Sequence, residues 1–349
     1  MEATPAAVAV VPVVAPASTT PPWNTVMKEE LLVDSYYMYN FSGANSLTPP
    51  ALRAYDTQSN SFTVNYAKVG LQVDSDPVSV RADIGFGALA ALLGGSSGPY
   101  SVAIQQAFAS LKLPGTPLTV DFGRFNTTAG AEVIEANRNW LYSRSMLFYI
   151  IPVHHTGVRA TLKINDMVSI QGTLANGIFN DMPDNNSTKT GGLSLSIAPL
   201  PTTSIVLTGY FGKEGAQGMT GDVRTTIDLV VGHNVSDALG LNLNVDYVKL
   251  GEANAVGAAA MGRFVAAEHL TLALRGEFIK DKGIFSGAET SVYEGTACAA
   301  FPFANHLEVR AELRGDFAAD PIFNQGTTEV PDVKKNQFTG TVAFLGYIQ

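Results

Sequence analysis

Residues 307–317 read LEVRAELRGDF, and apolar and charged side chains alternate along the whole stretch. One set comprises Leu307, Val309, Ala311, Leu313, Gly315 and Phe317, and the other comprises Glu308, Arg310, Glu312, Arg314 and Asp316. Because successive side chains of a β-strand point to opposite faces, this alternation indicates a strand with one apolar and one charged face. A soluble sandwich rarely carries charges of both signs in one unbroken row. We therefore interpret the charged face as part of the wall of an aqueous lumen.

The same period recurs along the chain almost to its last residue. In VSVRADIGF at 78–86, Val80 and Ile84 share one face, and Arg81 and Asp83 share the other. We predict about sixteen strands from this pattern. They lie near 30–41, 62–73, 77–87, 102–112, 117–125, 156–165, 167–178, 190–199, 203–212, 225–235, 240–251, 255–267, 269–281, 290–302, 306–317 and 336–348. The fold class that follows is all-β, a transmembrane antiparallel β-barrel.

Long connections alternate with short turns between these predicted strands. The long ones are 42–61, 88–101, 126–155, 179–189, 213–224 and 318–335, and the short ones include 74–76, 113–116, 165–166, 267–268 and 303–305. The connections after the eleventh and thirteenth strands are expected to be only moderately long. Short periplasmic turns and long extracellular loops are typical of barrels in the bacterial outer membrane, so both termini are expected in the periplasm.

The composition of the 349-residue chain excludes several other classes of protein. Charged residues make up 15% and hydrophobic residues 46%, against roughly 25% charged residues in ordinary soluble domains. Acidic or basic residues interrupt every hydrophobic run, so no spanning helix is expected. The net charge of −9 argues against a nucleic-acid partner. The single cysteine, Cys298, allows no internal disulfide, and we expect no cofactor.

Two regions of different character follow from the sequence. Residues 1–27 are rich in Pro and Ala and are predicted to be a disordered periplasmic tether. Residues 28–349 are predicted to form the barrel. Within the barrel, we expect the third long connection, 126–155, to fold inward as a constriction loop.

The constriction is predicted to carry charges of both signs. Its candidate residues are Glu132, Glu135, Arg138 and Arg144. If they face the wall across a narrow aqueous gap, they set a field that sorts solutes by charge. The alternative is that these charges pair among themselves and hold the loop in place.

A second set of charges is predicted to line the wall of the pore. Its members are Arg81, Asp83, Asp121, Arg159, Lys163, Arg263, Arg275, Glu277, Glu308, Arg310, Glu312 and Arg314. A cation facing lipid near the midplane costs roughly 2 to 4 kcal/mol, so alternation directs these side chains inward. Most of them are expected to be ordinary solvated wall.

The central part of the chain resembles a known family. The segments VDFGRFNTTAGAEVIEANRNWLYSRSMLF at 120–148 and PVHHTGVRATL at 152–162 are similar to the OmpL-like family of outer-membrane β-barrel porins. Weaker similarity extends from Val33 to Tyr347. The resemblance implies a passive channel in the outer membrane, and it implies no particular solute.

Metal and enzyme sites are not expected. His154 and His155 are adjacent, so they point to opposite sides of an extended segment and cannot share one ion. The oxygen-rich stretch from Asp181 to Asn186 lacks the spacing of a calcium loop. His233 has no partner in a nucleophile motif, so no catalytic residue is predicted.

We therefore expect a porin for the passive diffusion of small polar solutes or ions. The alternative is a scaffold or binding barrel that is plugged or encloses a partner. We expect the barrel to be surrounded by outer-membrane lipid. Small outward residues, namely Ala258, Ala260, Gly262, Gly295, Ala297 and Ala299, predict a contact with a second barrel, with plain lipid coverage as the alternative.

Overall fold

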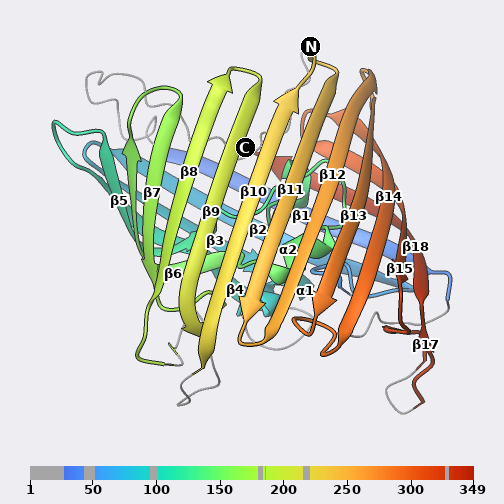
Figure 1. The fold of residues 1–349 in the computed structure, drawn as a ribbon. Helices are drawn as coiled ribbons and strands as arrows, with labels where there is room; N and C mark the ends of the chain where they lie inside the picture. Colours follow the sequence, from blue (N-terminus) through green and yellow to red (C-terminus); the bar gives the residue numbers. More distant parts are fainter. Residues whose placement is uncertain are drawn as a thin grey trace.

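The computed structural model describes residues 27–42, 52–94, 101–179, 184, 186–214, 221–326 and 330–349. The predicted tether, residues 1–27, lies outside these residues except for Met27. The described strands form a closed antiparallel barrel (Figure 1). The predicted fold class, an antiparallel barrel of sixteen strands, is confirmed.

The barrel strands are those that the alternating pattern predicts, with ends that differ by a few residues. They are β1 (Met27–Asn40), β2 (Ser61–Ser75), β3 (Val78–Phe86), β4 (Val102–Lys112), β5 (Leu118–Asn126), β6 (His154–Lys163), β7 (Val168–Ala175), β8 (Thr190–Leu200), β9 (Thr203–Glu214), β10 (Asp222–Asn234), β11 (Leu239–Leu250), β12 (Ala253–Ala267), β13 (Leu270–Lys282), β14 (Glu289–Ala304), β15 (Leu307–Ala318) and β18 (Asn336–Ile348). Short elements lie in the connections: α1 (Ala88–Leu92), η2 (Ala136–Arg138), α2 (Met146–Ile150), β16 (Phe323–Asn324) and β17 (Val333–Lys334).

The last strand closes the barrel. β18 pairs with β15 on one side and with β1 on the other, and Leu31 lies opposite Ile348 at one end of the β1–β18 ladder. All other neighbours along the wall are consecutive in the sequence, apart from the small β16–β17 sheet. The barrel therefore leaves no free edge among the described strands, which removes the unpaired backbone groups that an open sheet would expose.

The connections divide the barrel into two ends. Connections such as 76–77 and 201–202 are short, and we call their side the short-turn end; the opposite side is the long-loop end. One expectation is wrong here. The connection after β11 comprises only residues 251–252, although it lies at the long-loop end. Gly251 has a φ of +57°, a left-handed conformation that glycine adopts without strain, and this permits the tight reversal.

The two faces of the wall differ as the alternation predicts. Leu274 and Leu313 are 64% and 63% exposed on the outer face. The next residues, Arg275 and Arg314, are each 3% exposed on the inner face. Among the described residues, no helix is long and apolar enough to cross a membrane.

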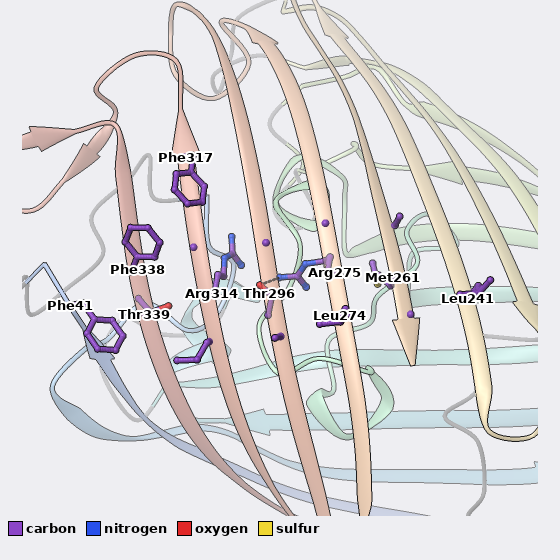
Figure 2. Close-up of a pocket in the computed structure, with 17 residues that line it drawn as sticks. Phe41, Leu241, Met261, Leu274, Arg275, Thr296, Arg314, Phe317, Phe338 and Thr339 are labelled. Atoms are coloured by element: carbon purple, nitrogen blue, oxygen red, sulfur yellow. Dashed lines mark hydrogen bonds between the residues drawn. The ribbon is translucent and has the colours of Figure 1, made fainter. Parts of the chain in front are cut away.

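A shallow apolar groove runs across the outer wall over β11 to β18 (Figure 2). Its volume is about 1070 Å³. Phe317 and Phe338 lie along one edge, and Leu241 lies toward the other. A Cβ atom added at Gly276 or Gly295 would meet no atom within 4 Å. The small residues of the floor therefore leave space that nothing in this chain fills.

Candidate functional site

The connection between β5 and β6, residues 127–153, lies inside the barrel, and we call it the inner loop. It contains η2 and α2, and α2 lies between the walls in Figure 1. Near its start, the backbone N–H of Gly130 donates to Asp228 Oδ1 at 3.0 Å, and that of Ala131 donates to Asn244 Oδ1 at 3.1 Å. Both acceptors belong to the inner faces of β10 and β11. This end of the loop is therefore fixed to the wall through its main chain.

The far end of the inner loop is held by Glu277 of β13. Its carboxylate accepts from the backbone N–H groups of Met146 and Leu147 at 2.7 and 2.6 Å. These are the first residues of α2, where helical N–H groups have no partner within the helix. Ser145 caps the same helix by accepting from the N–H of Phe148 at 3.1 Å. One wall carboxylate thus completes the hydrogen bonding of a buried helix start.

A third anchor lies on β15. Glu312 Oε2 accepts from the backbone N–H of Tyr142 at 2.7 Å, and Glu312 Oε1 accepts from that of Ser143 at 3.1 Å. On the same strand, Arg310 Nη1 donates to the carbonyl oxygen of Leu141 at 3.0 Å. The loop therefore runs along one side of the interior, from β10 to β15, and its main chain is bonded to the wall at several points on that side.

An apolar core also joins the loop to the wall. Leu141, Leu147 and Ile150 from the loop belong to the same buried cluster as Val248 and Ile279 from the wall. The sequence reasoning missed this, because it treated the inner face as wholly polar. A signal was present in β12, whose sequence ANAVGAAAMGRFVAA is apolar on both faces.

Glu132, one of the four predicted constriction residues, is 6% exposed, and its carboxylate is paired and hydrogen-bonded. Its carboxylate lies 2.9 Å from Arg275 Nη1 and accepts from the N–H of Ser145 at 2.7 Å. Arg275 also pairs with Glu294 at 3.0 Å. Here a loop charge and a wall charge pair directly with each other, which is neither a pair within the loop nor a pair of charges facing each other across a gap.

Glu135 is likewise paired with a cation of the wall, on the opposite side of the barrel. Its Oε1 lies 2.6 Å from Lys68 Nζ on β2 and accepts from Gln105 Nε2 at 3.0 Å. Burial alone would raise the pKa of Glu135, but Lys68 and Arg138 outweigh that effect and hold the pKa at about 2. The carboxylate therefore stays ionised at physiological pH.

The two predicted arginines differ from each other. Arg138 has a side chain that is 38% exposed and lies 3.0 Å from Glu30 of β1. Arg144 is buried and donates to carbonyl oxygens within the loop, including that of Val133 at 3.0 Å. Its guanidinium lies 5.3 Å from the ring centroid of Tyr55. Arg138 thus borders accessible space, while Arg144 holds the loop together.

The register puts all twelve predicted wall residues on the inner face, but their exposure divides them. Eight are buried: Asp83, Asp121, Arg263, Arg275, Glu277, Arg310, Glu312 and Arg314. Four are half-buried: Arg81, Arg159, Lys163 and Glu308. The half-buried ones lie toward the short-turn end, where Ser110, Thr161, Ser169 and Ser196 are also partly exposed. The interior therefore widens into a polar vestibule at that end.

The long-loop half of the interior is more tightly filled. Thr208 and Tyr210 of β9 point inward and are each 1% exposed. His155 of β6 packs against Tyr210 with the two rings tilted by 44° and their centroids 4.5 Å apart. Asp56 and Arg53, which pair with each other in the first long connection, are also buried. Segments from several connections thus close over the inner loop.

No group of three or more His, Cys, Asp or Glu residues in the described part of the chain is placed to hold a metal ion. The oxygen-rich stretch considered for calcium is described only at Asp184 and Asn186. Asp184 pairs there with Lys189.

A family model described as "Putative beta-barrel porin-2, OmpL-like" matches residues 28–345. The search of curated proteins gave no match. Among solved structures, the outer membrane channel DcaP of Acinetobacter baumannii is 11% identical with a TM-score of 0.64, covering 92% of this chain and 97% of that chain. OmpF of Salmonella typhi, in complex with daunomycin, is 12% identical with a TM-score of 0.61, covering 95% and 100%. An anion-selective porin from Comamonas acidovorans is 12% identical with a TM-score of 0.59, covering 92% and 99%. At these identities the likeness shows the fold alone.

Arg275→Met should detach the inner loop from β13, because it leaves Glu132 and Glu294 buried without their cation. Removing one partner of a buried pair costs about 3 to 5 kcal/mol. We expect faster hydrogen exchange and faster proteolysis within 127–153. Lys163→Met is the matched control, because Lys163 pairs with the exposed Asp166 at 2.8 Å and should change little. Equal protection of the loop in both variants would contradict the anchoring role.

Proposed function

Since the chain belongs to the OmpL-like β-barrel porin family, we propose that it conducts small polar solutes or ions passively across the bacterial outer membrane, past a constriction that the inner loop forms. The observation that carries this proposal is the path of the loop, whose main chain is bonded to Asp228 of β10, Glu277 of β13 and Glu312 of β15. A barrel of this size leaves an aqueous channel unless an inserted element narrows it. The vestibule at the short-turn end supplies a polar approach.

The proposed route follows the wall from β4 to β9. Its partly exposed inner side chains include the hydroxyls of Ser110 and Thr161 and the guanidinium of Arg159, with the apolar Phe108 and Val206 among them. The opposite wall is occupied by the loop and its apolar core. Solutes on this route would exchange hydration water for hydroxyl groups, without meeting a broad apolar surface.

A second candidate is a closed barrel that does not conduct. The burial of Thr208, Tyr210 and His155 in the long-loop half favours it. Conductance in a planar bilayer distinguishes the two candidates, because a closed barrel stays silent.

Deletion of residues 130–139 should raise single-channel conductance and admit larger sugars, because it removes the loop's contacts with β10 and β11 and its pairs with Arg275 and Lys68. The double variant Glu277→Gln and Glu312→Gln keeps the loop's length but weakens two anchors, and a smaller rise is expected. Heat-modifiable migration on gels checks that each variant assembles. If the deletion variant assembles and conducts as the parent does, the loop does not limit the pore.

We propose further that the long-loop end faces the outside and the short-turn end the periplasm, with both termini periplasmic. Asp332→Cys, with a side chain 57% exposed at the long-loop end, should react with a bulky polymer-linked maleimide on intact cells. Asp166→Cys, with a side chain 89% exposed at a short turn, should react only after the outer membrane is permeabilised. The native Cys298 is buried and gives little background. The reverse labelling pattern would invert the orientation.

The outer groove is proposed as the contact with a second copy of the chain. Its lining includes Ala260, Gly262, Gly295 and Ala297 from the predicted patch, but neither Ala258 nor Ala299. Small residues on an apolar outer wall let another backbone approach closely.

Gly276→Leu together with Gly295→Leu should abolish an oligomer on native gels, because both leucines fill the groove. Neither side chain meets an atom of its own chain at the Cβ position, so the barrel should assemble. Leu207→Ala, on the outer wall away from the groove, is the control. An oligomer that persists in the double variant would leave lipid as the occupant of the groove.

A further inference from the structure

Arg263 of β12 is a buried inner-wall arginine that makes no ion pair with any residue that the structure describes. It is 7% exposed, and its Nε atom has no hydrogen-bond partner. No carboxylate of the described residues lies within ion-pairing distance of its guanidinium. Guanidinium carries five N–H donors and no acceptor, and buried donors without partners are costly. Such a group is expected to serve a ligand.

The other buried arginines of the described chain behave differently. They are Arg53, Arg144, Arg275, Arg310 and Arg314. Each donates to a carboxylate or a carbonyl oxygen of this chain. Arg53 and Arg314 each keep one nitrogen without a hydrogen-bond partner, but Arg263 differs in having no carboxylate or carbonyl acceptor among the described residues.

Two neighbours give the surroundings of Arg263 a recognisable chemistry. The guanidinium carbon lies 5.7 Å from the ring centroid of Trp140 at the tip of the inner loop. Asn242 of β11 is 7% exposed, and its Oδ1 atom has no partner among the described residues. The Nδ2 hydrogens of this amide are the donors that it can offer to a carboxylate. On the ladder, Arg263 lies between Gly240 and Ala273. The absence of a side chain at Gly240 lets the Trp140 ring pack there, because an added Cβ atom would lie 3.1 Å from it.

The position of this group makes it reachable from the vestibule. Thr271 and Val265, which pair with each other toward the short-turn end, are only half-buried. Trp140 and Met261 add apolar surface on the other side. A ligand would thus meet a cation and an amide at one end and an aromatic ring at the other.

We propose that Arg263, Asn242 and Trp140 form a binding site for small organic carboxylates that carry an apolar group. The planar fork of a guanidinium matches the two oxygens of a carboxylate. The indole ring of Trp140 and the thioether of Met261 pack against the apolar part of the ligand. As a site on the transport route, it rests on the proposed porin function and assigns that function a class of solute.

The chain contains two tryptophans, Trp23 and Trp140, which makes binding directly measurable. In a Trp23→Phe background, the fluorescence of Trp140 should change on titration with cyclohexanecarboxylate, which does not absorb at the excitation wavelength. Cyclohexanecarboxamide lacks the charge and tests whether binding requires it. Acetate and inorganic phosphate lack the cyclohexyl group and test whether binding requires the apolar part. Each should bind at least about tenfold more weakly.

Arg263→Met should weaken cyclohexanecarboxylate binding at least about tenfold, whereas Arg263→Lys should weaken it less. Lys28→Met is the control, because Lys28 already pairs with Asp74 at 2.9 Å and its loss should retain full binding. If Arg263→Met does not assemble, Asn242→Leu carries the same test. Unchanged binding in the variants, equal loss with Lys28→Met, or equal binding of the amide would overturn the site.

Conductance separates this inference from the proposed function. If the protein shows no conductance in bilayers but binds the carboxylate at Trp140, passive conduction is refuted and the proposed binding site stands. If the protein conducts, but cyclohexanecarboxylate reduces the current equally in the parent and in Arg263→Met, the proposed porin function stands and the proposed binding site is refuted.

Discussion

The structure depends on one constraint: backbone N–H groups that enter the barrel interior must still find acceptors there. The inner loop brings main chain into a space that its own secondary structure cannot satisfy. Asp228, Glu277 and Glu312 supply carboxylate oxygens at those points. From the alternation alone, these wall carboxylates would be taken for solvated pore lining. In the structure they accept hydrogen bonds from the loop, and Arg275 of the wall pairs with Glu132 of the loop.

The sequence predicts the wall well because strand alternation is local. Each residue's face follows from its neighbours, so the strands and nearly all connections are apparent without tertiary information. The tight turn at Gly251 was missed because a single glycine carries little signal on its own. The pairing of Glu132 with Arg275 joins positions 143 residues apart, and no local pattern encodes it. Which charges are neutralised and which remain accessible therefore had to come from the fold.

The interior is divided unequally between its two walls. From β10 to β15 the wall carries the anchors of the loop. It also carries an apolar surface that the loop covers, and this surface includes Val248 and Ile279. From β4 to β9 it carries hydroxyl groups such as Ser110 and Thr161. The same barrel thus behaves as a protein core on one side and as a hydrated surface on the other. Arg263 and Trp140 meet on the side that resembles a protein core.

The anchors of the inner loop also order the events of folding. Tyr142 reaches its acceptor on Glu312 across 170 residues of sequence, and Met146 reaches Glu277 across 131. Contacts of such long sequence separation form only after a large loop-closure entropy has been overcome. Glu277 and Glu312 belong to the C-terminal third of the chain, so these two contacts cannot form until β13 and β15 are in place, whereas Glu135 has its partner Lys68 on β2. The N-terminal strands must therefore be assembled around a segment whose contacts with β13 and β15 are made only when the barrel is nearly complete.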